Sequence, residues 1–424
     1  MTNHRGSGGF VKGYNREIEE TMSNENDLKR RNLIWIFTAV IALTGLGLGL
    51  SDAVFANYYK DAYNADAFQR GLIELPREMP GFICVFIISA LGFLGDIRLS
   101  VIAQVLTVFA LTVLGLMTPT FSVMLIFLFL FSLGQHMFMP LGDSLGMSLA
   151  KEGGVGSVLG RLNGVRTAFT MIAGILVFVG FRQGFFSFTT PIKSIFLIAA
   201  VIFSIVLILL LKMRQLVGEI TPQQKFRLII RKEYRIFYLL AALFGARKQI
   251  MLVYAPWVLI ELLGFKADTM ALLAIAGAAV GIFFMPAVGR WIDRYGTARI
   301  MMIEAAAFFV IYIAYGLLSG GLSKGTLAAS GFAVAIAFVI NMADRMTMQF
   351  GMVRAVYMRS VAVTPDEVTP TLSAGMSLDH VLSILSAIFC GWIWEQLGAQ
   401  YVFAFAALLS LCNMLVARQI KATS

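Results

Sequence analysis

The sequence predicts an all-α polytopic membrane protein whose twelve transmembrane helices form two pseudo-symmetric six-helix bundles. Of 424 residues, 58% are hydrophobic and 14% are charged, a balance that a water-soluble domain of this size cannot bury. Apolar runs of about 20 residues, the length that crosses a bilayer core of about 30 Å, recur between short polar breaks. The runs lack the alternating pattern of a transmembrane barrel, so they favour helices.

The apolar runs are expected to cross the membrane one after another. They predict spans at 33–56, 69–93, 100–118, 121–147, 160–181, 190–212, 235–261, 267–289, 299–318, 325–352, 371–395 and 399–417. The polar stretch before the first span has no apolar segment long enough for a secretory signal. The chain therefore divides into an N-terminal tail (1–32), a first six-helix bundle (33–212), a basic linker (213–234), a second bundle (235–417) and a C-terminal tail (418–424).

The distribution of Lys and Arg predicts the orientation. Twelve spans place both termini on one side, where 23 basic residues fall, against six on the other side. Because basic residues collect on the cytoplasmic side, we expect cytoplasmic termini and a location in the cell inner (plasma) membrane. The net charge of +10 reflects this orientation, and no soluble domain is available to carry a basic groove for nucleic acid. The six residues on the other side are Lys60, Arg70, Arg182, Lys193, Lys266 and Lys324.

A similar turn follows the second span of each half. The first runs from Gly92 to Arg98 and contains Asp96, and the second runs from Gly289 to Gly296 and contains Asp293. The two aspartates are separated by 197 residues, the difference between 293 and 96. This repeat predicts the duplication of one six-helix unit.

These turns resemble the signature of the major facilitator superfamily, which runs Gly, three residues, Asp, Arg, one residue, Gly in each half. Gly289, Asp293, Arg294 and Gly296 match it, whereas the first turn keeps Gly92 and Asp96 but has Ile97 and Leu99 in place of Arg and Gly. The resemblance implies two bundles that rock about a central cavity lined by the first, fourth, seventh and tenth spans. It also implies a gating role for the residues of the turns: Asp96, Asp293 and Arg294.

Charged residues near the middle of apolar spans are candidates for binding substrate. An ionisable group there costs about 2.5–3.5 kcal/mol on insertion scales, so it needs a partner, water or a function. Arg247 and Lys248 lie in the seventh span, and the first hypothesis is that one or both bind an anionic group of a substrate. The alternative is a structural pair with a buried carboxylate such as Asp52 or Asp379. Further candidates for the substrate site are Tyr254, Trp257, Gln135 and Asn341.

Other intramembrane groups are candidates for a coupled proton, since the unperturbed pKa of histidine lies near neutrality. The proton candidates are His136, Asp379, His380 and Asp52. A neutral His136 that is only hydrogen-bonded between helices is the alternative for that residue. Three charges on one helical face of the second span, between Pro76 and Pro80, predict either an outer gate or a structural knot: Glu74, Arg77 and Glu78. The remaining charges are expected to form intramembrane pairs: Asp143, Asp344, Arg345 and Arg166.

Together these features predict a secondary active transporter that moves a small anionic or zwitterionic solute by alternating access and is coupled to protons. The alternatives are a drug or lipid efflux antiporter and a membrane receptor that keeps the fold without transporting. No phosphate-binding loop and no nucleophile–base pairing suggest an enzyme, and the three cysteines lack metal-ligand spacing. We therefore expect a monomer that needs no cofactor or metal, whose partners are the solute, the bilayer and protons or another coupling ion.

Overall fold

The computed structural model describes residues 31–149, 155–217, 229–364 and 367–420. Nearly all of the predicted tail at 1–32, the middle of the predicted linker at 213–234 and the end of the C-terminal tail lie outside the described residues. The described part is helical and contains no strand. Ten of its helices are long and apolar enough to cross a membrane, so the chain is a multi-pass membrane protein.

The first half begins with a continuous helical segment, Arg31–Tyr63, interrupted by a short 3₁₀ turn, η1 (Asp52–Val54), that leads into α2 (Phe55–Tyr63). The helices that follow in this half are α3 (Ala67–Leu72), α4 (Glu74–Ala90), α5 (Asp96–Leu116), α6 (Phe121–Ser148), α7 (Val155–Arg182) and α8 (Ser194–Val217). The second half contains α9 (Arg235–Trp257) with a π turn (Val258–Leu262), α10 (Ala267–Tyr295), α11 (Thr297–Ser323), α12 (Phe332–Met348), η5 (Gln349–Met352), α13 (Val353–Val361), α14 (Val368–Leu397) and α15 (Ala399–Ala417).

Two passes are not among the ten apolar helices because they are broken and charged. One is α3 with α4, and the other is α12 with η5 and α13. With them the described residues make twelve passes, and the predicted all-α membrane fold is confirmed. The tenth pass occupies 332–361, later than the predicted 325–352, because its helix continues through η5 into α13.

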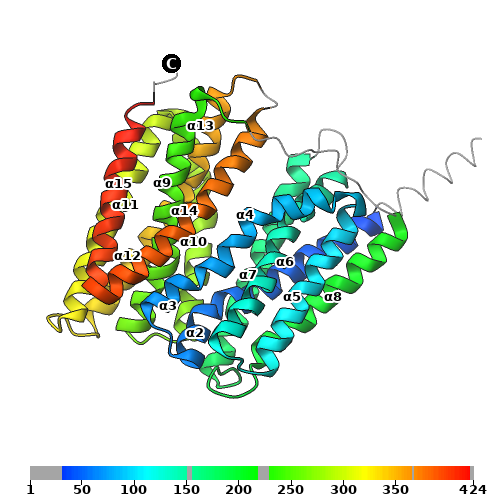
Figure 1. Cartoon of the computed structure of the whole chain (residues 1–424), viewed down its shortest axis with the longest axis horizontal. Helices are drawn as coiled ribbons and strands as arrows, with labels where there is room; N and C mark the ends of the chain where they lie inside the picture. Colours follow the sequence, from blue (N-terminus) through cyan, green and yellow to red (C-terminus); the bar gives the residue numbers. More distant parts are fainter. Residues whose placement is uncertain (1–30, 150–154, 218–228, 365–366, 421–424) are drawn as a thin grey trace, which may run out of the picture.

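Helix contacts repeat from one half to the other. In the first half α5 packs against α6 and α8, and in the second half α11 packs against α12 and α15. Likewise α4 packs against α6, and α10 packs against α12. These are the same pairs of passes counted within each half, so each half forms one bundle with a common internal plan (Figure 1).

The bundles meet along two seams, where α7 packs against α10 and where α3 and α4 pack against α14. We call the half of the interface farther from residues 31 and 420 the sealed half, because polar contacts there join the bundles. Lys60 Nζ lies 2.5 Å from Glu261 Oε2, and Lys266 Nζ lies 2.9 Å from Asp61 Oδ1. The backbone N–H of Ala67 donates to Glu395 Oε1 at 2.9 Å.

Backbones approach closely within the sealed half. A Cβ atom built on Gly391 would lie 2.8 Å from the carbonyl oxygen of Ala67 and 2.9 Å from the Cα of Phe68, both in the other bundle. Only a residue without a Cβ allows α14 to approach α3 at this distance.

The two repeated turns differ in their contacts. Gly95 and Gly296 precede α5 and α11 with φ values of +82° and +79°, which favour glycine. Asp96 is fully buried and accepts a hydrogen bond from Ser144 Oγ at 2.6 Å, whereas Asp293 and Arg294 are exposed. No neighbouring helix of the described residues packs closely on Gly289, since a Cβ built there meets nothing within 4 Å beyond its own stretch of helix.

Candidate functional site

A chain of charges runs along α4 at the interface between the bundles. Arg77 donates to Glu74 Oε1 at 3.1 Å and to Asp52 Oδ1 at 2.8 Å. Asp52 is the first residue of the short 3₁₀ turn η1 (Asp52–Val54), at which the helix of the first pass is interrupted. Glu74 is buried and also accepts from Arg70 at 2.5 Å and from Gln249 of the other bundle at 2.6 Å. The predicted cluster of Glu74 and Arg77 therefore forms, and it reaches across the interface.

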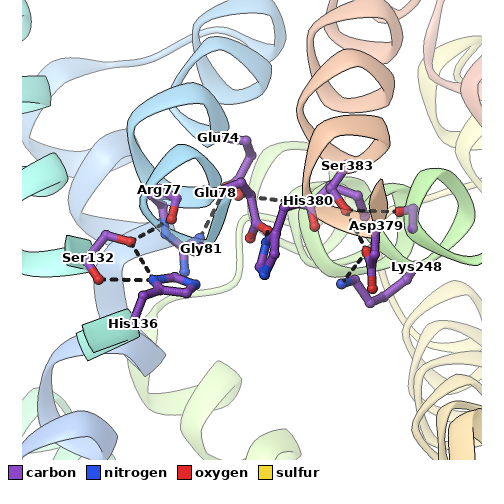
Figure 2. Close-up of polar contacts among 12 residues, drawn as sticks. Glu74, Arg77, Glu78, Gly81, Ser132, His136, Lys248, Asp379, His380 and Ser383 are labelled. Atoms are coloured by element: carbon purple, nitrogen blue, oxygen red, sulfur yellow. Dashed lines mark hydrogen bonds and ion pairs between the residues drawn. The ribbon is translucent and has the colours of Figure 1, made fainter. Parts of the chain in front are cut away.

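Glu78 forms the second contact across the interface, one turn farther along α4. Its Oε2 lies 2.7 Å from Nδ1 of His380 on α14. A Cβ on Gly81 would lie 2.5 Å from two atoms of the His380 ring, so glycine leaves the room that this imidazole needs. Figure 2 shows the two side chains pointing toward each other between the bundles. The two residues were predicted as a gating residue and a proton candidate, and the structure brings them together.

Lys248 and Asp379 lie beside this contact on the second bundle. Lys248 Nζ donates to Asp379 Oδ1 at 2.8 Å, and both side chains are 17% exposed. Ser383 Oγ donates to the same carboxylate oxygen at 3.1 Å. This is the structural pair that was the alternative hypothesis for Lys248, and it lies beside His380 (Figure 2).

A cavity of about 230 Å³ opens next to these groups. Its walls come from the first bundle: Thr44, Leu48, Asp52, Arg77, Glu78, Phe131, Ser132, Gln135, His136, Phe138, Met139 and Arg166. Of the six predicted substrate contacts, Gln135 lines this cavity. The wall combines apolar rings with carboxylates, hydroxyls and guanidinium groups, as expected for a solute with both apolar and charged parts.

His136 lies on α6 at the side of the cavity. Its Nδ1 is 2.9 Å from the carbonyl oxygen of Ser132 and 3.1 Å from Ser132 Oγ, both one turn back on its own helix. The His136 and His380 ring centroids are 5.4 Å apart. His136 thus faces the interface but takes its hydrogen bonds within the first bundle.

Arg166 and Asp143 lie close together, as a pair that is barely in contact. The distance from Arg166 Nη2 to Asp143 Oδ1 is 3.9 Å, and the Arg166 side chain is 27% exposed. Its Nε is buried and has no hydrogen-bond partner among the described residues. Arg166 is therefore the guanidinium on the cavity wall with the most unused hydrogen-bonding capacity, since Arg77 is bound by two carboxylates.

Arg247 does not reach the cavity. Its Nη2 donates to Glu304 Oε1 at 2.8 Å, and both side chains are 1% exposed. Arg354 Nη1 donates to the same oxygen at 3.1 Å. The Arg247 guanidinium also lies 4.1 Å from the centre of the Phe308 ring, within cation–π range. Of the two hypotheses for Arg247, this arrangement is the structural pair, with a carboxylate other than the two named.

The other predicted contacts in the second bundle are also packed among protein atoms. Tyr254 donates to the carbonyl of Ala387 at 2.5 Å, and Trp257 is fully buried. Asn341 Oδ1 accepts from Arg345 Nε at 3.0 Å. Asp344 is buried, and its Oδ1 has no described partner. None of these residues lines the cavity described above.

Several residues of the site were not predicted from the sequence. Glu304 binds Arg247 and shares its carboxylate with Arg354, Gln249 bridges the bundles, and Gly81 makes room for His380. Glu304 carries a signal that could have found it, because it is an acidic residue inside an apolar span and must have a cationic partner. Gly81 carries none, since its role is visible only when α4 faces α14.

Two matching helical bundles with ionisable groups at their interface are the architecture of a secondary transporter. A family model described as Major Facilitator Superfamily matches residues 37–374. The match covers most of the chain, and the protein belongs to the major facilitator superfamily. It is a secondary transporter of that type.

Solved structures with the same fold include transporters of different solutes. A single-residue variant of the nucleoside transporter NupG has a TM-score of 0.74 and 16% identity, covering 91% of this chain and 99% of that one. A POT family transporter in complex with a thioalcohol-conjugated peptide has a TM-score of 0.70 and 12% identity, with coverages of 91% and 94%. A D-xylose–proton symporter has a TM-score of 0.67 and 14% identity, with coverages of 91% and 96%. Among curated proteins no sequence matches this chain significantly.

Proposed function

We propose that this protein couples the movement of a small solute bearing an anionic group to the movement of a proton. The solute binds in the cavity of the first bundle with its anionic group on Arg166, and the proton binds to His380, which bridges to Glu78. The observation that carries the proposal is the 2.7 Å contact between His380 and Glu78 across the interface, at the edge of that cavity.

Charge balance supports a single proton at this contact. The charged groups at and beside this contact are three basic and four acidic side chains, so with ionised carboxylates and neutral imidazoles they carry one negative charge together. One proton on His380 makes it neutral. The groups in this count are Arg70, Arg77, Lys248, Asp52, Glu74, Glu78 and Asp379. An uncompensated charge at mid-depth in the membrane is costly, so protonation stabilises the joined bundles.

The ring geometry of His380 fits a proton carrier. If Nδ1–H donates to Glu78, Nε2 is the nitrogen that gains and loses the coupled proton. Protonation turns the hydrogen bond between a neutral imidazole and the Glu78 carboxylate into an ion pair across the interface, and deprotonation weakens it. The protonation state of His380 thereby changes how strongly the bundles hold together, which links proton binding to alternating access.

Arg166 supplies the anion contact because its guanidinium has hydrogen-bonding capacity left for a ligand. Arg247 is held by buried Glu304 and Lys248 by Asp379, whereas Arg166 faces the cavity with a long contact to Asp143. A carboxylate or phosphate can accept two parallel hydrogen bonds from a guanidinium. The anionic solute predicted from the sequence is kept, with the contact moved from Arg247 and Lys248 to Arg166.

The orientation of the protein in the membrane is inferred from its basic residues, and the sealed half then shows which side is closed. Basic residues favour termini on the cytoplasmic side, and the ion pairs of the sealed half then close the outer side. We therefore assign this arrangement to a conformation in which the solute reaches the cytoplasm.

The test uses purified protein in proteoliposomes. A thermal-shift screen of small carboxylates, phosphates, amino acids and sugars first identifies a ligand. His380→Gln and Glu78→Gln should then still exchange that solute across the membrane at equal concentrations, but fail to accumulate it when a pH gradient is imposed. Glu233→Gln is the control, since Glu233 is exposed on the short turn η3 (Lys232–Tyr234), away from the cavity, and it should keep gradient-driven accumulation. Normal accumulation by His380→Gln would rule out the proposed proton site.

The apolar part of the cavity wall supports a second candidate, an efflux antiporter for amphiphilic compounds. Phe131, Phe138, Met139 and Leu48 supply this surface. This function predicts that amphiphilic cations stabilise the protein more than small acids do, and that their movement opposes that of protons.

A further inference from the structure

A second cavity lies on the outer side of the second bundle, away from the interface. It is an open groove of about 490 Å³ between α11 and α15, two helices that pack along each other (Figure 1). Leu317 is 73% exposed beside it and Tyr401 is 50% exposed, so the groove faces the bilayer. It belongs to neither the solute cavity nor the seams between the bundles.

The polarity of the groove changes along its length. At the end of α11 and the start of α15 it is lined by Lys324, Thr326, Gln400 and Tyr401, and deeper in the membrane by Ile313, Gly316 and Ala404. From Lys324 to Tyr312 the groove follows twelve residues of helix, about 18 Å. A polar end at the membrane–water interface and an apolar end in the hydrocarbon match the two parts of a phospholipid.

Lys324 differs from the other basic residues on the side of the sealed half. Lys60, Lys266 and Arg182 lie within 4 Å of Glu261, Asp61 and Asp268, and Arg70 binds Glu74. Lys193 is buried and donates to backbone oxygens at 2.6 and 3.2 Å. The part of the chain that the structure describes contains no acidic partner for Lys324, which is exposed at the mouth of the groove. Gln400 adds a buried Oε1 without a hydrogen-bond partner.

We propose that this groove is a binding site for an anionic phospholipid. The phosphate group accepts hydrogen bonds from Lys324, and one acyl chain lies along Gly316 and Leu317 between the two helices. A cation near the membrane surface that no protein group neutralises attracts anionic head groups. Glycine at position 316 keeps a side chain out of the floor of the groove, where a Cβ would already touch the carbonyl oxygen of Gln400 at 3.5 Å.

Native mass spectrometry of the full chain with phosphatidylglycerol or phosphatidylcholine tests the proposal. The wild-type protein should retain phosphatidylglycerol preferentially. Lys324→Gln should lower this retention about fivefold, corresponding to about 1 kcal/mol for one basic residue near the surface. Gly316→Leu fills the apolar part and should lower the retention of both lipids. The matched control is Lys212→Gln, an exposed lysine on the opposite side of the membrane.

Three outcomes would overturn the site. Equal loss in Lys324→Gln and Lys212→Gln would mean that only the overall charge matters. Retention unchanged by Gly316→Leu, with a thermal unfolding curve like that of the wild type, would exclude an acyl chain in the groove. Equal retention of glycerol 3-phosphate, which has no acyl chain, would show that the site binds a phosphate group and not a lipid.

Discussion

The two bundles share a helical plan but use their buried charges differently. In the first bundle Arg77, Glu78 and Arg166 line a cavity. In the second bundle Arg247 and Arg354 both bind Glu304 deep in the protein, and Arg247 and Glu304 are each 1% exposed. The two halves therefore share the packing of their helices but not the chemistry of their buried charges.

This difference suggests that the two bundles have different roles in transport. A buried ion pair without access to water holds its helices in a fixed arrangement, because breaking it leaves a charge that cannot be solvated. Charges on a cavity wall can exchange one partner for another. We infer that the second bundle is the rigid partner and contributes His380 to the interface, while the first bundle binds the solute.

The largest effect is expected for the buried pair of the second bundle. Glu304→Gln removes the carboxylate from two guanidinium groups and should destabilise the protein by about 3–5 kcal/mol. Thermal unfolding of the purified protein measures this loss. Glu261→Gln is the control, since Glu261 is 31% exposed at the sealed half and should cost less than about 1 kcal/mol. Similar stability of the two variants would contradict the claim that the buried ion pair holds the second bundle in a fixed arrangement.

Replacement of the cavity guanidinium should affect binding more than stability. Arg166→Gln should weaken binding of the anionic ligand found by screening by about 1.5–3 kcal/mol, the range for hydrogen bonds to charged groups. Calorimetric titration of the purified protein measures the change. Arg182→Gln, on the same helix with a side chain 71% exposed, serves as control. Unchanged affinity in Arg166→Gln would leave the first bundle without its proposed anion contact.

Close backbone approach at the sealed half can be tested with one added side chain. Gly391→Val places a Cβ within 3 Å of Ala67 and Phe68, so the sealed arrangement should lose about 1–3 kcal/mol relative to the opposite conformation. Asn57 on α2 is fully buried at the sealed half and donates to the carbonyl of Phe265 in the other bundle. A cysteine introduced at position 57 should then react faster with a membrane-impermeant maleimide added from the outer side. An unchanged labelling rate would mean that α3 and α14 do not separate during the transport cycle.

The smallest effect is expected for the partly exposed ion pairs of the sealed half. Lys60 and Glu261 are 24% and 31% exposed, and such pairs contribute about 0.2–1 kcal/mol. A double-mutant cycle with Lys60→Gln and Glu261→Gln should give a coupling energy in this range. A value comparable to that for Arg247 and Glu304 would indicate that the outer contacts also act as a fixed structural core.

Much of the fold could be predicted from the sequence, because crossing a bilayer imposes a local requirement on length and polarity. The bounds of the broken passes were harder to predict from the sequence. The tenth pass continues through η5 to Val361, and it carries Asp344, Arg345 and Arg354 inside the protein. The charges of the site were also visible as ionisable residues inside apolar runs. Their partners were not, since Glu78 and His380 are 302 residues apart in the chain.

Local composition thus determined that this chain crosses the membrane, how often it does so, and which side chains must find partners there. Tertiary structure alone decided that Arg247 meets Glu304 in a dry core while Arg166 faces a cavity. The free-energy cost of a charge in the membrane is set by the residue itself. Whether a partner group offsets that cost depends on which helices lie beside the residue.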